Sequence, residues 1–108
     1  MDGVAETGGT MVINKVLDGE TLTISLEGRL DTLTSPDLEK VLQENLNGAE
    51  TLVFDFEKLE YISSSGLRVL LFAHKQMFSK GGMVVKNVNE TVSEVFEVTG
   101  FTDLLSIE

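Results

Sequence analysis

Cysteine and histidine, which supply many catalytic and metal-binding groups, are almost missing from this sequence of 108 residues: it has no Cys and one His, His74. The lack of Cys excludes a disulfide framework, a thiolate nucleophile and a Cys-based zinc site, and it favours a reducing compartment. A single His, with carboxylates spread over several predicted elements, gives no recognisable ligand spacing for a metal. We therefore expect neither a metal nor another cofactor.

Basic residues and long apolar runs are also scarce. Eight Lys and Arg against 18 Asp and Glu give a net charge of −10, so the chain lacks the positive surface that binds nucleic acid or anionic lipid. The longest apolar run spans residues 69–73, far below the ~20 residues that cross a bilayer, and the N-terminus lacks a basic, apolar leader. These features predict a soluble, cytoplasmic protein that binds neither nucleic acid nor membrane.

The motifs of common enzyme classes are absent as well. The sequence contains no G-x-S-x-G elbow and no glycine-rich phosphate loop. Ser65 and His74 are nine residues apart, which on one helix corresponds to about 13 Å, far beyond the ~3 Å that a proton transfer requires. His74 lies within an apolar stripe, so we expect it to pack against the core. An autonomous enzyme is not expected.

What is present is the composition of a globular domain, with 42% hydrophobic and 24% charged residues. Residues 1–10 contain three Gly and little to bury, so we expect a flexible segment there and a single domain over residues 11–108. From Met11, apolar residues alternate with polar ones around Asp18-Gly19. This pattern predicts a β-hairpin, because Asp-Gly tolerates the positive φ of a tight turn.

Further elements follow from periodicity and from start and stop residues. After a loop over residues 28–34, Ser35 as cap and Pro36 predict a helix that ends near Asn47-Gly48, followed by an inner strand over residues 51–56. A long helix is predicted after residues 63–66, ending at Gly81-Gly82. Its buried stripe is expected to comprise Leu67, Leu70, Leu71, His74, Met77 and Phe78.

The C-terminal part is predicted to contain a strand, a helix and an edge strand. The strand spans residues 83–88, and the helix begins at Asn89 as its cap and ends at Gly100. The edge strand covers residues 104–107. Together the elements predict an α/β fold with a mixed four- to five-stranded sheet and helices packed mainly on one face.

Three consecutive hydroxyls, those of Ser63, Ser64 and Ser65, lie at the turn from the inner strand into the long helix. The first amides of a helix lack intrachain acceptors and carry a partial positive charge, so a phosphate on a hydroxyl there would be accommodated. The plainer explanation is that Ser64 or Ser65 caps the helix. Capping and phosphorylation are compatible.

In element order and in four motifs, the sequence resembles the stand-alone STAS domains, the anti-sigma factor antagonists. The resemblance extends over residues 11–107, and its motifs are LEGRLD at 26–31, LVFDF at 52–56, YISSSGLR at 61–68 and GGM at 81–83. It implies a STAS-like fold and a binding module that is switched by phosphorylation. The implied partners are a serine kinase that is also the anti-sigma factor, whose sigma factor is released on binding, and a serine phosphatase that resets the switch.

The resemblance also implies site residues. The phosphoacceptor, the Ser directly before the motif's Gly, falls on Ser65, and the loop acid that recognises the partner falls on Asp31. The acid that commonly opens the motif is replaced here by Ser63, which leaves Ser64 as a competing acceptor. The other expected partner-binding residues are Ser63, Ser64, Gly66, Leu67, Arg68 and Phe72. Phe72 lies opposite the Leu70/Leu71 stripe, where it either faces a partner or packs on a neighbouring helix.

Two alternative functions stay open at this point. The chain could be a scaffold subunit of a signalling or transporter-associated assembly, in which Ser65 is only a helix cap. It could instead bind a small nucleotide or lipid in a pocket above the sheet edge. Neighbouring kinase, phosphatase and sigma factor genes would favour the antagonist, a transport operon would favour the scaffold, and a co-purifying ligand would favour the third function.

Overall fold

The computed structural model describes residues 3–6 and 11–108. Within these residues the strands are β1 (Gly3–Glu6), β2 (Met11–Asp18), β3 (Thr21–Leu30), β4 (Thr51–Ile62), β5 (Met83–Lys86) and β6 (Ser106–Ile107). The helices are α1 (Ser35–Asn45), which continues into the 3-10 turn η1 (Leu46–Gly48), α2 (Ser64–Met77), α3 (Glu90–Thr99) and α4 (Phe101–Leu104).

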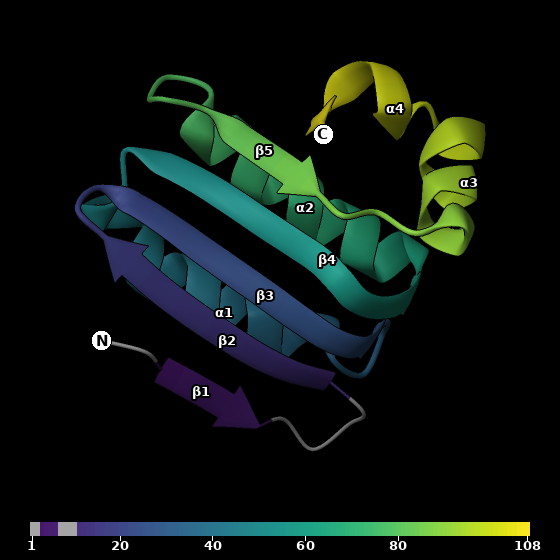
Figure 1. The fold of residues 1–108 in the computed structure, drawn as a ribbon, viewed down its shortest axis with the longest axis horizontal. Coiled ribbons are helices and arrows are strands. Elements are labelled where there is room, and N and C mark those ends of the chain that lie inside the picture. The colour runs from purple at the N-terminus through teal and green to yellow at the C-terminus, as the bar shows by residue number, and fades with distance from the viewer. Residues whose placement is uncertain (1–2, 7–10) are drawn as a thin grey trace.

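All of these strands form one sheet in the order β1-β2-β3-β4-β5-β6. The pairs β1/β2 and β2/β3 are antiparallel, whereas β3/β4, β4/β5 and β5/β6 are parallel and are separated in sequence by helices. In Figure 1, α1 and α2 lie together behind the sheet, while α3 and α4 lie at its C-terminal edge. The predicted α/β fold, with a mixed sheet and helices mainly on one face, is confirmed.

The sheet contains one strand more than the upper number expected from the sequence. The additional strand, β1, lies within the segment predicted to be flexible and pairs with β2 along residues 12–15. Residues 1–2 and 7–10 of that segment lie outside the described residues, so their flexibility stays a prediction.

The hydrophobic core lies between the sheet and the helices. In β3, Leu22, Ile24 and Leu26 are buried, and the residues between them are partly exposed on the opposite face. The central strand β4 contributes Phe54 and Phe56, which are both fully buried with ring centroids 5.5 Å apart. Because one face of each strand is covered and the other is open, the period-two alternation seen in the sequence persists in the fold.

Strand β4 is twice as long as the strand predicted over residues 51–56, and two irregularities allow this length. Asp55 pairs with Ser25, but Lys58 pairs with Glu27, so β4 has one extra residue between these positions. A second shift separates the pair Gly28–Leu59 from the pair Arg29–Tyr61. Such bulges interrupt the alternation of side chains, which is why the sequence pattern loses its strand signal after Phe56.

Turn and cap residues fulfil most of their predicted roles. Gly19 has φ of 63° in the β2–β3 turn, and Asn89 caps α3 by accepting a hydrogen bond from the Val92 amide at 2.8 Å. Gly100 ends α3 in the left-handed conformation, with φ of 83°. The prediction of Ser35 as the cap of α1 is wrong, because Thr34 occupies that position and the Ser35 hydroxyl instead donates to the Asp31 carbonyl at 2.6 Å.

The C-terminal end of α2 departs from prediction as well. The helix ends at Met77, before the Gly81-Gly82 pair, and Phe78 is 80% exposed although it was predicted to be buried.

Among the helices in the described part of the chain, none has the length and apolar character needed to cross a membrane.

Candidate functional site

The first turn of α2 holds the serine cluster. Ser63 is the N-cap: its hydroxyl accepts a hydrogen bond from the Gly66 amide at 3.4 Å, and its carbonyl accepts one from the Leu67 amide at 2.9 Å. The predicted cap, Ser64 or Ser65, is therefore wrong by one or two positions. Ser64 is exposed and Ser65 is half-buried. Because Ser63 caps the helix, the hydroxyls of Ser64 and Ser65 are available for other contacts.

A short loop over residues 31–34, between β3 and α1, lies beside this turn. We call it the Asp31 loop, because Asp31 makes most of the contacts that hold its shape. One carboxylate oxygen of Asp31 accepts hydrogen bonds from the backbone amides of Leu33 at 3.0 Å and Thr34 at 3.2 Å. The other forms an ion pair with Arg29 at 3.7 Å, and the Arg29 guanidinium lies over the Tyr61 ring at 4.6 Å. The carboxylate of Asp31 thus fixes the shape of the loop, and its role in partner recognition stays a prediction.

Two hydrogen bonds join the loop to the first turn of α2. The Ser63 amide donates to the Leu30 carbonyl at 2.9 Å. The hydroxyl oxygens of Thr32 and Ser65 are 3.2 Å apart, within hydrogen-bonding distance, although 33 residues separate them in sequence. Because β3 and β4 are parallel neighbours, their C-terminal ends place both segments at the same edge of the sheet.

A groove of about 280 Å³ opens where the loop, α1 and α2 meet. It is lined by Thr32, Ser35, Pro36, Glu39, Ser65, Arg68, Val69 and Phe72. Ser65, Arg68 and Phe72 are spaced at three and four residues and so share one face of α2. We call this feature the α1–α2 groove; five of its eight lining residues are polar, and three, Pro36, Val69 and Phe72, are apolar.

The structure separates the predicted partner-binding residues into two groups. Ser64 and Arg68 are exposed and Phe72 is partly buried against the core, so these side chains remain accessible. Gly66 and Leu67 are buried, and Leu67, only 6% exposed, belongs to the hydrophobic core. Leu67 therefore offers a partner little side-chain area, and its role in partner binding stays a prediction.

Sequence reasoning missed several residues of this region. Thr32, Pro36 and Glu39 line the groove, and Leu33, in the Asp31 loop, is 78% exposed. A lone exposed apolar residue is common on protein surfaces, so Leu33 gives no sequence signal of a site. The Thr32–Ser65 contact carries no such signal, since it depends on the pairing of two strands.

His74 lies on α2 nine residues beyond Ser65, half-buried, with its ring centroid 6.1 Å from that of Phe78. Because Phe78 is itself exposed, the predicted packing of His74 against the core stays a prediction. Within residues 11–108, no group of three His, Asp or Glu side chains is arranged to hold a metal ion.

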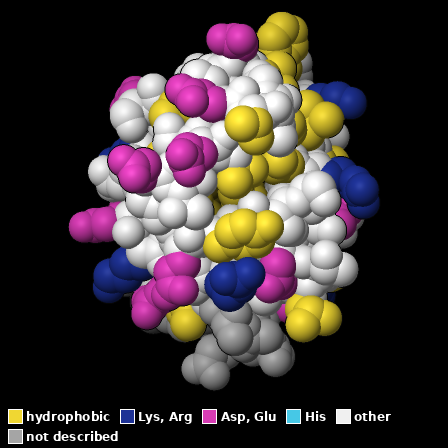
Figure 2. Space-filling view, turned by 90° about the vertical axis from the view of Figure 1, so that its right-hand side faces the viewer, with side chains coloured by type: hydrophobic (Ala, Val, Ile, Leu, Met, Phe, Trp, Pro, Cys, Tyr) yellow, Lys and Arg dark blue, Asp and Glu magenta, His cyan; other side chains and the backbone are white. Residues whose placement is uncertain are grey.

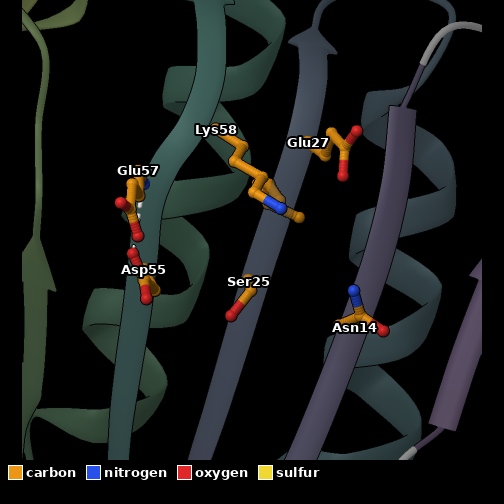
Figure 3. A pocket seen from close by; sticks show the side chains of 7 residues that line it. Asn14, Ser25, Glu27, Asp55, Glu57 and Lys58 are labelled. Carbon is orange, nitrogen blue, oxygen red and sulfur yellow. Dashed lines mark hydrogen bonds between the residues drawn. The ribbon is translucent and has the colours of Figure 1, made fainter.

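A second hollow lies on the helix-free face of the sheet and bears on the small-ligand alternative. Its volume is about 230 Å³, and Figure 3 shows its polar side chains, which come from β2, β3 and β4: Asn14, Ser25, Glu27, Asp55, Glu57 and Lys58. Asp55 already accepts hydrogen bonds from the Asn87 side chain at 2.9 Å and the Glu57 amide at 3.1 Å. The hollow carries the carboxylates of Glu27, Asp55 and Glu57 but only one ammonium group, that of Lys58. Its net negative charge repels the phosphates of a nucleotide, and its polar lining is unsuited to a lipid chain.

Comparisons with known proteins agree with the geometry. The family model for the Mlab STAS domain matches residues 13–106. BtrV of Bordetella bronchiseptica, a candidate anti-sigma factor antagonist, is 34% identical over 93 residues, which cover 84% of this chain and 79% of that protein.

Two solved structures share the fold. An anti-sigma factor antagonist from Mycobacterium paratuberculosis superposes with a TM-score of 0.84 at 18% identity, covering 95% of this chain and 89% of its own. The phosphorylated form of SpoIIAA, a Bacillus cell fate determinant, superposes with a TM-score of 0.68 at 19% identity, covering 100% of this chain and 91% of its own. The chain therefore belongs to the STAS domain family, in which its relatives are anti-sigma factor antagonists.

Proposed function

We propose that this protein antagonises an anti-sigma factor that is also a serine kinase, and that phosphorylation of Ser65 turns the interaction off. The observation that carries the proposal is the position of the Ser65 hydroxyl, which is half-buried in the first turn of α2 and lines the α1–α2 groove. In the unphosphorylated state the groove binds the anti-sigma factor, and the sigma factor it held is released. A serine phosphatase restores the binding-competent state.

The first turn of α2 can carry a phosphate without unfolding. Ser64 and Ser65 are the first two residues of the helix, where backbone amides lack helical acceptors and the helix dipole favours negative charge. Arg68 lines the same groove three residues further along, so its guanidinium lies on the face that would receive the phosphate. The added charge of about −2 therefore acts on the partner more than on the fold.

The capping role of Ser63 explains the unusual residue at the start of the motif. Asp and Ser are both good N-cap residues, because either side chain offers an oxygen to the free amides. Ser63 performs this function through its bond to the Gly66 amide. The replacement of the acid therefore preserves the geometry of the turn and removes one negative charge beside Ser65.

Binding without catalysis is part of the proposal. The groove contains three hydroxyls, those of Thr32, Ser35 and Ser65, one carboxylate and one guanidinium. His74 lies more than two helical turns from Ser65, so no imidazole near the groove can act as a general base. The proposed activity is the exchange of protein partners.

The first test is phosphorylation by the cognate serine kinase with ATP. We expect the wild-type protein to incorporate phosphate, and Ser65→Ala to lose the label because its acceptor oxygen is missing. Ser64→Ala is the matched control, since it removes an adjacent and more exposed hydroxyl; it should be labelled like wild type. Undiminished labelling of Ser65→Ala, read by intact mass and phosphosite mapping, would refute the assignment. Label lost only in Ser64→Ala would assign the acceptor to Ser64.

The second test measures the effect of charge at Ser65 on binding to that kinase. Ser65→Asp should weaken binding at least tenfold, because a carboxylate in the groove must lose its water shell at the contact. Ser79→Asp is the control, since Ser79 is exposed beyond the opposite end of α2 and the substitution adds the same charge. Isothermal titration calorimetry gives both affinities. Equal affinities for the two variants would contradict the switch.

A further inference from the structure

The C-terminal segment of the chain has a charge distribution unlike the rest of the molecule. Residues 87–108 include no Lys or Arg and five acids, Glu90, Glu94, Glu97, Asp103 and Glu108. All five are exposed. Half of the net charge of −10 therefore comes from about a fifth of the chain, at the edge of the molecule where α3 and α4 lie.

Exposed apolar side chains accompany these acids. The inner face of α3 buries Val92 and Phe96, whereas Val98 on its outer face is 83% exposed. A shallow groove of about 430 Å³ runs along this outer face and is lined by Thr91, Glu94, Val95, Glu97 and Val98. We call these five residues the α3 surface. Leu104 and Ile107, at 42% and 36% exposure, add further apolar area in the same segment.

Figure 2 shows how the two kinds of side chain are arranged. In the upper half of this view, hydrophobic side chains form a strip, and Asp and Glu side chains gather along its left side. Basic side chains lie at the margins of that region, mainly on its right-hand side. The exposed apolar area is thus bordered on one side by negative charge, an arrangement complementary to an amphipathic, basic partner.

We propose that the α3 surface binds a helix of a partner protein that has an apolar stripe flanked by Lys or Arg. The apolar stripe would cover Val95 and Val98, and the basic flank would lie beside Glu94 and Glu97. Nucleic acid and anionic membranes are repelled by the acids. A second copy of this chain is disfavoured, because the same acidic face would meet itself.

The α3 surface is separate from the site of the proposed function. None of its residues lines the α1–α2 groove, and none lies on α1 or α2. The inference therefore stands independently of phosphorylation at Ser65. The two surfaces share no lining residue, so a partner on the α3 surface need not compete with one in the α1–α2 groove.

The test uses a synthetic, amidated helical peptide of Leu and Lys, with Leu at every third and fourth position and Lys along one flank. Two control peptides are a scrambled sequence of the same composition and an analogue with Glu in place of Lys. The full-length, ¹⁵N-labelled protein is titrated with each. We expect shift changes centred on residues 91–98 with the amphipathic basic peptide, weakening as salt is raised, and at least tenfold weaker binding of both controls.

Variants separate specific docking from general attraction to an acidic protein. Val98→Ser should weaken binding of the peptide at least tenfold, and Glu94→Gln with Glu97→Gln should weaken it and reduce its salt dependence. The matched controls are Phe78→Ser, which removes an equally exposed apolar side chain from the end of α2, and Glu20→Gln with Glu50→Gln, which removes two exposed acids elsewhere. Both control proteins should bind like wild type.

Several results would overturn the proposal. Shift changes spread over all acidic regions, or centred on the α1–α2 groove, would show that α3 is not the docking site. Equal binding of the scrambled peptide, or unchanged affinity of Val98→Ser, would show that the apolar stripe is not recognised. A wild-type dimer in sedimentation analysis that Val98→Ser dissociates would assign the surface to a second copy of the chain.

Discussion

Replacing Phe54 by alanine is expected to lower the free energy of unfolding by about 3–5 kcal/mol. The Phe54 side chain has no solvent exposure, and its ring lies against that of Phe56. Its strand, β4, is central, between β3 and β5, so neighbouring backbone cannot collapse into the space that the ring leaves. Since the free energy of unfolding of such domains is about 5–15 kcal/mol, the substitution removes a large part of the stability of the protein. Urea unfolding followed by circular dichroism measures the change.

Phe78→Ala is the matched control, because it removes the same atoms from a residue that is 80% exposed. We expect it to change stability by less than about 0.5 kcal/mol, as is usual for surface positions. Similar losses in the two variants would mean that the sheet and helices do not enclose Phe54 as the structure indicates.

The fold could be predicted from the sequence wherever one local pattern determined the structure. The alternation of Leu22, Ile24 and Leu26 gave β3 its buried face, and the Asp18-Gly19 pair gave the hairpin turn. Helix α3 begins after its cap Asn89 and ends at Gly100, as expected. In each case the stabilising interaction lies within a few residues of the signal, so the sequence alone contains it.

The errors lie where an interaction outside the recognised pattern decides. Ser35 is not the cap of α1, because its hydroxyl donates to the Asp31 carbonyl and the helix has Thr34 at the cap position. β4 continued past Phe56 because pairing with β3 tolerates two bulges. A local pattern records neither the competing hydrogen bonds nor the partner strand.

For the candidate site too, one part could be predicted from the sequence and another could not. Its position at the start of α2 could be predicted, because hydroxyls between a strand and a helix have a local physical meaning. Its shape could not, since the α1–α2 groove is built from three segments that only the sheet brings together. The Thr32–Ser65 contact is an example: it needs the C-terminal ends of β3 and β4 to be neighbours.

Gly66→Ala is expected to destabilise the protein by about 2 kcal/mol, although alanine normally stabilises a helix by about 0.5–1 kcal/mol relative to glycine. A Cβ at Gly66 would lie 2.7 Å from Cγ of Leu30 and 2.8 Å from Cγ1 of Ile62. Both side chains are buried in the core, so the contact can be relieved only by shifting α2 away from the sheet. Gly66→Val should lower the free energy of unfolding more than Gly66→Ala does, because its side chain is larger.

Gly48→Ala provides the control, since a Cβ there meets no atom within 4 Å; it should be neutral or slightly stabilising. The same shift at Gly66 would move the first turn of α2 away from the Asp31 loop, because Leu30 precedes that loop and Ile62 precedes Ser63. At a temperature where Gly66→Ala is still folded, we therefore expect it to be phosphorylated more slowly than wild type and Gly48→Ala to be phosphorylated at the wild-type rate. A Gly66→Ala protein as stable as wild type would show that the close packing of α2 on the ends of β3 and β4 does not position the serine cluster.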